Sequence, residues 1–113
     1  VGGNGARIEY REDRWYIAAD IVHMQYKHRR WIGWQPSLFV GRHYAFDIKG
    51  VKPFFRLGAG VSNQNEAVSG YWRINTAVGI EWKKLSFMWN HASTAGITHA
   101  NRGEDLLIWE LRL

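Results

Sequence analysis

Side chains that alternate between apolar and polar at every second position constrain the fold of this chain more than any other feature. The alternation is clearest in residues 71–83, where even positions are mostly large and apolar and odd positions are polar or small. Residues 51–61 repeat it, with Gly58 and Gly60 on the face opposite an apolar row. A period of two residues indicates β-strands with two unlike faces. We therefore expect an all-β protein, and the glycines predict a crowded interior.

Seven segments are expected to form strands: residues 6–11, 15–26, 31–44, 51–61, 71–83, 85–93 and 105–113. Bacterial outer-membrane barrels have an even number of strands. The expected fold is therefore an antiparallel, up-and-down transmembrane β-barrel of the eight-stranded type, in a single domain over residues 1–113, with its first strand missing or truncated. The glycine-rich residues 1–5 are expected to be a loop that follows this strand.

Trp72 and Trp82 favour a membrane barrel over a soluble β-protein. They share a face and are ten residues apart. A tilted strand with a rise of ~3.3 Å per residue climbs about 25 Å over that span, which is the height of the apolar band between the aromatic girdles of an outer-membrane barrel. A soluble sandwich with both rings in its core is one alternative, and a soluble lipid-carrying barrel is another.

The charge of the chain points to an anionic partner. The formal net charge is +5. Cysteine is absent, and its absence excludes disulfides and thiolate chemistry. Because Lys and Arg are interleaved into the strands, we do not expect nucleic acid as a partner.

An eight-stranded barrel has an interior just wide enough for side chains. We expect a lumenal salt-bridge network formed by Arg7, Glu9, Arg11, Asp20, Arg56, Arg73, Glu81, Glu110 and Arg112.

The lengths of the connections predict the orientation of the barrel. Residues 12–14, 47–50 and 83–84 are tight connections, which outer-membrane barrels place on the periplasmic side. The longer loops, residues 27–30, 62–70 and 94–102, then lie outside. We expect Lys27, Arg29 and Arg30 to contact lipopolysaccharide phosphates there, with a solvated charge run as the alternative.

His91, Ser93 and Asp105 are the candidate catalytic residues, and all three are expected on the lipid-facing side of their strands. We expect the last hairpin to pair Ser93 with Gly103. In that register His91 faces Asp105 across the ladder. Serine is too weakly acidic to attack an ester unaided, histidine can accept its proton, and a carboxylate orients the imidazole. Gly96 could offer its N–H to the developing oxyanion.

Two motifs in this sequence resemble those of a known family. The segment HASTAGITHANRGED is similar to a stretch H-x-S-N-A-G followed by Asn-x-Gly and an acid, and VKPFFRLGAGV is similar to a K-P-F strand with alternating glycines. Together with a third strand over residues 36–40, they cover about the last two-thirds of the chain. They resemble the lipid A 3-O-deacylase (PagL) family of Gram-negative outer membranes. The resemblance implies hydrolysis of the ester between a 3-hydroxyacyl chain and the 3-position of lipid A.

The resemblance also implies a role for each site residue. His91 matches the general base, Ser93 the nucleophile, Asp105 a third member that is usually Glu, and Gly96 an oxyanion donor. Thr94 stands where the family usually has Asn and is the second candidate for the oxyanion hole. The acyl groove is expected to be lined by Phe87, Trp89, Leu107 and Trp109.

Two alternatives to an active deacylase stay open. An impaired deacylase homologue is one alternative, because Thr94 and Asp105 depart from the family pattern. A non-catalytic structural or adhesion barrel is another. Lipid A and outer-membrane lipid are the expected partners, and a homodimer is kept open. The proposed chemistry requires neither a metal nor a cofactor, and the histidines show no metal-binding spacing.

Overall fold

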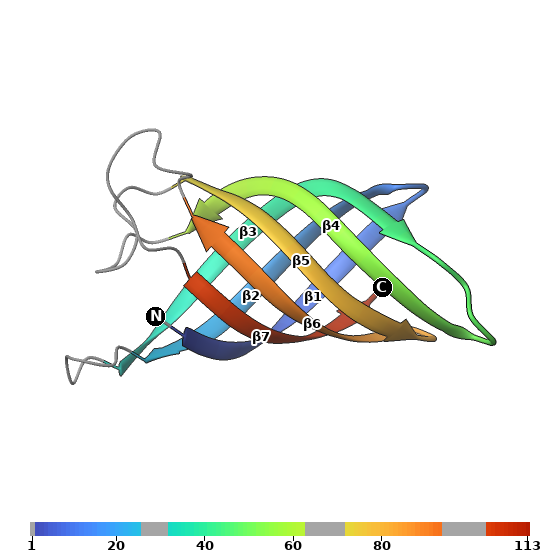
Figure 1. The fold of residues 1–113 in the computed structure, drawn as a ribbon. Helices are drawn as coiled ribbons and strands as arrows, with labels where there is room; N and C mark the ends of the chain where they lie inside the picture. The colour runs from blue at the N-terminus through green and yellow to red at the C-terminus, as the bar shows by residue number, and fades with distance from the viewer. Residues whose placement is uncertain (1, 26–31, 63–71, 94–103) are drawn as a thin grey trace.

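A computed structural model of the chain describes residues 2–25, 32–62, 72–93 and 104–113, and these residues form a closed β-barrel (Figure 1). Its seven strands are β1 (Gly2–Glu12), β2 (Trp15–Gln25), β3 (Ile32–Ala45), β4 (Val51–Ser62), β5 (Trp72–Trp82), β6 (Leu85–Ser93) and β7 (Glu104–Arg112). The described residues include no helix long and apolar enough to cross a membrane. The predicted all-β fold is confirmed, and apart from the start of β1 each strand end falls within about one residue of its predicted position.

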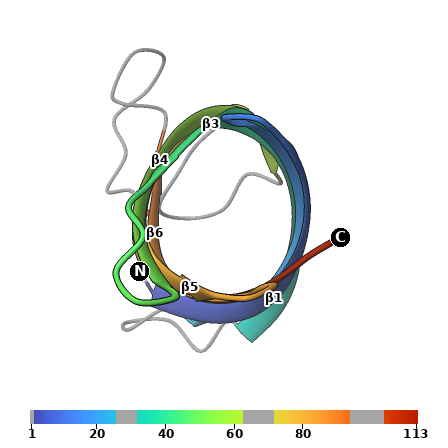
Figure 2. The same cartoon turned by 90° about the vertical axis from the view of Figure 1, so that its right-hand side faces the viewer.

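The barrel closes between its first and last strands, and this pair runs parallel. Every other neighbouring pair is antiparallel, whereas β1 and β7 pair in parallel from Gly2 opposite Asp105 to Glu9 opposite Arg112. Figure 2, which looks toward one end of the barrel, shows the strands as a closed ring. In an up-and-down sheet with an odd number of strands, the first and last strands point the same way, so closure requires a parallel pair. The expected count of eight and the purely antiparallel pairing therefore differ from this seven-stranded ring.

The predicted loop at residues 1–5 is also wrong for the residues that the structure describes. Gly2 to Gly5 belong to β1 and pair with Gln25 to Val22 of β2. Gly5 shows why small residues occupy this stretch, because a Cβ there would press on the backbone oxygen of Ile21. The glycines allow close approach of two strands here instead of forming a turn.

The two faces of the wall have opposite chemistry. Along β5 the outward side chains Val78, Ile80 and Trp82 are each more than half exposed. The inward side chains of the same strand include Arg73, Asn75 and Glu81, all fully buried. This is the reverse of a soluble β-protein, whose apolar face is buried and whose polar face is wet. The barrel therefore presents an apolar outer wall and a polar interior, the distribution of a transmembrane barrel.

The interior is held by buried ion pairs, as predicted. Arg56 donates to Glu110 and to Glu9, with N to O distances of 2.5 and 2.6 Å, and its Nε donates to His43 at 2.9 Å. Arg7 pairs with Asp20 at 2.7 Å. The remaining pairs join Arg11 to Glu9 and Glu81 and, more loosely, Arg112 to Glu81. The predicted member Arg73 is fully buried and donates to the carbonyl of Trp72.

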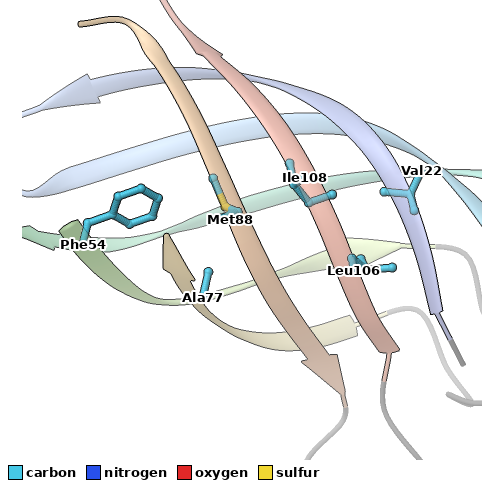
Figure 3. Packing of buried hydrophobic residues seen from close by; sticks show 6 residues of the cluster. All are labelled: Val22, Phe54, Ala77, Met88, Leu106 and Ile108. Atoms are coloured by element: carbon cyan, nitrogen blue, oxygen red, sulfur yellow. The ribbon is translucent and has the colours of Figure 1, made fainter. Parts of the chain in front are cut away.

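Apolar side chains fill the space that the ion pairs leave inside the barrel. Figure 3 shows one such cluster, in which side chains from five strands lie around the lumen: Val22, Phe54, Ala77, Met88, Leu106 and Ile108. A second cluster consists of Tyr16, Ala18, Phe39 and Ala92. Over the described residues the lumen is thus occupied by paired charges and buried apolar side chains, as expected for a barrel of this size.

The two ends of the barrel differ in their connections. At one end β1 turns into β2 at residues 13–14, β3 into β4 at residues 46–50, and β5 into β6 at residues 83–84. Asp13, Lys49, Gly50 and Lys83 have positive φ in these turns, as tight hairpin connections require. β2, β4 and β6 end, and β3, β5 and β7 begin, at the other end (Figure 1), and in the sequence these strands are separated by the longer stretches 26–31, 63–71 and 94–103. The expected contacts of Lys27, Arg29 and Arg30 lie outside the described residues.

Candidate active site

The candidate site lies on the outer face of the last hairpin, at the end of the barrel with the long connections. Because side chains alternate along a strand, the buried residues Met88, Asn90 and Ala92 place their neighbours on the outer face of β6. The side chains of His91 and Asp105 are 38% and 51% exposed, respectively. The predicted outward direction of these two residues is confirmed.

His91 and Asp105 form a direct pair across the ladder. In the register of β6 and β7 His91 lies opposite Asp105, Trp89 opposite Leu107, and Phe87 opposite Trp109. His91 Nδ1 is 2.9 Å from Asp105 Oδ1, which is hydrogen-bond distance. When Nδ1 carries the proton it donates to the carboxylate, and Nε2 is then the acceptor nitrogen. The arrangement orients an imidazole so that its basic nitrogen is directed away from the acid.

Ser93 is on the same face of β6 as His91, two residues closer to the end of the strand. It lies opposite Ile74 of β5 and is partly exposed. Residues two apart on a strand are separated by ~6.6 Å along its axis, so side chains on one face can converge above it. Ser93, His91 and Asp105 thus share the outward face of the last hairpin, where His91 and Asp105 are in direct contact. Gly103, the expected partner of Ser93, lies outside the described residues, as do Thr94 and Gly96.

Large apolar side chains continue the wall from His91 toward the short-turn end. The rings of Phe87 and Trp109 pack at 4.8 Å between centroids, and Trp89 is 6.3 Å from His91 by the same measure. Trp89, Leu107 and Trp109 are each about half exposed. The four predicted groove residues therefore form one continuous apolar surface beside the pair.

A hollow does exist on the outer wall, next to this surface. It has a volume of about 500 Å³ and is lined by residues of β1, β2, β6 and β7, among them Trp109. Its floor is low because Ala6 and Ala19 stand among bulky outward neighbours such as Ile8 and Ile21. The two small outward residues were a signal in the sequence, but their juxtaposition with Trp109 depends on the pairing of β1 with β7.

The described residues contain no group of three His, Asp or Glu side chains that could hold a metal ion. The candidate site consists of an outward histidine and acid, a serine on the same face of β6 and an apolar surface on the wall of a closed barrel.

This combination of fold and site defines a class of protein, a β-barrel that carries a hydrolase-like His-acid pair on its apolar outer surface. Residues 4–113 match the sequence model of the family Lipid A 3-O-deacylase (PagL). The chain belongs to this family. Neither a curated protein nor a solved structure matches it. Membership places the chain in a family of lipid A deacylases, which are hydrolases, and confirms the resemblance drawn from the two motifs.

Proposed function

We propose that this chain is a serine esterase of the Gram-negative outer membrane that removes the 3-hydroxyacyl chain ester-linked to the 3-position of lipid A. The hydrogen bond between His91 and Asp105 on the outer wall carries the proposal. A histidine and a carboxylate facing the bilayer are costly unless they serve a function. Family membership supplies the substrate class.

In the proposed reaction Ser93 transfers its hydroxyl proton to Nε2 of His91 while its Oγ attacks the ester carbonyl carbon. Asp105 stabilises the imidazolium that forms. The N–H of Gly96, together with Thr94, is proposed to hold the oxyanion. The bond from the acyl carbon to the glucosamine oxygen then breaks, and His91 gives this oxygen its proton. One water molecule hydrolyses the acyl-enzyme and restores the serine.

The depth of the site supports a lipid substrate. His91 and Ser93 lie near the end of β6, and Trp89 and Leu107 lie one step further into the apolar wall. An amphiphile with its sugar at the membrane surface and its acyl chains in the bilayer would place its ester bonds near this boundary. Its chains would lie against Phe87 and Trp109.

The short side chain of Asp105 is compatible with the proposed role. The family usually has Glu at this position, and a shorter acid raises the question of reach. Because Asp105 lies directly opposite His91 in the ladder, its carboxylate spans the gap and reaches Nδ1 at 2.9 Å. This geometry favours a working triad over an impaired homologue.

Lysine and arginine side chains of the connection at residues 26–31 are proposed to bind the lipid A phosphates. In the sequence Lys27, Arg29 and Arg30 follow β2, and β2 ends at the end of the barrel that carries the candidate site. Phosphate contacts there would fix the disaccharide above the outer wall. Association of two copies of the chain stays a prediction.

The decisive experiment compares two serine variants on one strand. Ser93→Ala removes the proposed nucleophile, whereas Ser86→Ala removes a hydroxyl that faces the lumen and bonds Glu81. Purified, folded proteins are incubated with lipid A, and released fatty acid and residual lipid A are measured by mass spectrometry. We expect loss of one 3-hydroxyacyl chain with the wild type and Ser86→Ala, and none with Ser93→Ala. Release that survives Ser93→Ala would exclude the serine mechanism, and no release by the wild type would favour a non-catalytic barrel.

A further inference from the structure

A second cluster on the outer wall lies at the opposite end of the barrel from His91. Its members are Arg14, Trp15, Arg42 and Tyr44, and we call it the arginine-aromatic cluster. Arg42 lies over the Trp15 ring at 4.7 Å from its centroid and over Tyr44 at 5.9 Å. Arg14 also lies 5.9 Å from the Tyr44 centroid. Two guanidinium groups thus share one aromatic ring.

Cross-strand pairing builds this cluster. Trp15 begins β2 and lies directly opposite Arg42 of β3. Tyr44 is on the same outer face two residues along, and its ring stacks on Phe55 of β4 at 5.2 Å. The backbone carbonyl of Arg14 accepts a hydrogen bond from His43 N, which ties the first turn to β3. The rings are therefore held in place, and the guanidinium groups lie on them.

Among the described residues, Arg14 and Arg42 differ from the interior arginines because no carboxylate pairs with them. Arg7, Arg11 and Arg56 each pair with a carboxylate inside the barrel. Within the described part of the chain, neither Arg14 nor Arg42 forms an ion pair, and the shielded Nε of Arg42 has no hydrogen-bond partner. The cluster thus presents two positive charges at the surface, and neither has a carboxylate partner among the described residues.

The position of the cluster identifies what could neutralise it. In outer-membrane barrels short turns face the periplasm, and Trp and Tyr lie at the level of the lipid headgroups. Arg14 and Arg42 would therefore lie at the phosphate depth of the inner leaflet. A guanidinium fork matches phosphate oxygens, and an aromatic ring beneath it limits its motion. A lipid of net negative charge fits better than a zwitterionic one, whose own cation competes for the phosphate.

We infer that the arginine-aromatic cluster binds the phosphate of an anionic phospholipid of the phosphatidylglycerol type in the periplasmic leaflet. The site is separate from His91 and Asp105. It depends on the chain lying in a membrane in the proposed orientation, but not on catalysis. Loss of deacylase activity and loss of lipid binding are therefore distinguishable outcomes.

The test titrates folded protein in detergent with phosphatidylglycerol or with phosphatidylcholine of the same acyl chains, and counts bound lipid by native mass spectrometry. The variant Arg14→Gln with Arg42→Gln removes both charges and keeps the rings. The control Lys49→Gln with Lys84→Gln removes the same charge from turns at the same end, where neither lysine lies over a ring in the described structure. We expect the arginine variant to weaken phosphatidylglycerol binding about tenfold or more, since loss of a single charge-assisted hydrogen bond to a phosphate already costs roughly tenfold. The lysine control and the phosphatidylcholine titrations are expected to change little.

Three results would overturn the inference. The arginine variant could bind phosphatidylglycerol as tightly as the wild type. Both double variants could lose binding equally, which would indicate diffuse attraction to a basic end and no defined site. The wild type could bind the two lipids alike. If the arginine variant does not fold, Arg42→Lys replaces it, because lysine keeps the charge but lacks the guanidinium fork. We expect Arg42→Lys to bind phosphatidylglycerol several-fold more weakly than the wild type. Unchanged binding by Arg42→Lys would also contradict the proposed site.

Discussion

Asp105 lies directly opposite His91 in the antiparallel ladder of β6 and β7, and its Oδ1 is 2.9 Å from Nδ1 of the imidazole. Both side chains face outward, above a wall of aromatic and aliphatic residues. A carboxylate held in this position can fix the tautomer of the histidine and stabilise its cation. Within the proposed triad, the contact between His91 and Asp105 is therefore supported directly by an interatomic distance.

Asp105→Asn is expected to lower the rate of lipid A deacylation by about 10³ to 10⁴-fold, because an amide can hold His91 in the wrong tautomer and does not stabilise its cation. Asp105→Glu retains the charge, and the exposed position leaves room for one more methylene. We expect it to keep activity within about tenfold of the wild type. Initial rates of fatty-acid release from lipid A micelles measure both. Equal rates for Asp105→Asn and the wild type would remove Asp105 from the mechanism.

Trp89→Ala is expected to raise the KM for lipid A about tenfold with little change in kcat, because the ring supplies apolar contact area beside His91 and no chemistry. Trp82→Ala is the matched control, since its ring is similarly exposed on the outer wall but lies at the short-turn end. Rates measured over a range of lipid A concentrations separate the two parameters. If both variants raise KM equally, Trp89 contributes only to general attachment to the lipid surface.

The sequence predicted well whatever depends on neighbours along the chain. The alternation fixed which residues face outward, and in the last hairpin it paired His91 with Asp105 because packing of Phe87 against Trp109 requires the same register. Closure of the barrel was not predictable in this way. The parallel pairing of Gly2 with Asp105 joins residues from the two ends of the chain, and no local pattern encodes it.

Features that depend on several strands were missed for the same reason. The hollow beside Trp109 requires Ala6 and Ala19 to come together across β1 and β2 next to β7. The contact of Arg42 with Trp15 requires the register of β2 and β3. No pattern within a single segment predicts these contacts, because each depends on which strands are neighbours in the barrel and on their register.

Arg56→Met is expected to destabilise the folded barrel by about 3–5 kcal/mol, because it leaves the buried carboxylate of Glu110 without its arginine partner and leaves Glu9 with Arg11 alone. Arg112→Met is the control. This arginine is 30% exposed and lies 3.6 Å from Glu81, so its loss is expected to cost less than about 1 kcal/mol. Urea unfolding of protein folded into lipid vesicles, followed by tryptophan fluorescence, measures the difference. Similar stability of the two variants would show that the interior tolerates unpaired carboxylates, through bound water or rearrangement.

Gly58→Val is expected to prevent folding or to shift the unfolding midpoint far toward low urea. A Cβ at this position would lie 2.7 Å from both the Asn75 side-chain oxygen and the Val40 backbone oxygen, and it would also press on the Tyr16 hydroxyl. Two of these groups belong to the interior packing, and the backbone oxygen cannot move without breaking the ladder between β3 and β4. Gly50→Asn tests the opposite case: its φ of 88° lies in the left-handed region, which Asn tolerates, and no atom lies within 4 Å of the added Cβ. The fraction of each variant that gains heat-modifiable mobility on a gel measures folding. The Cβ added at Gly58 meets three atoms, so we expect Gly58→Val to remain unfolded. The Cβ added at Gly50 meets none, so we expect Gly50→Asn to fold like the wild type. Normal folding of Gly58→Val would mean that the interior is less crowded than this packing requires.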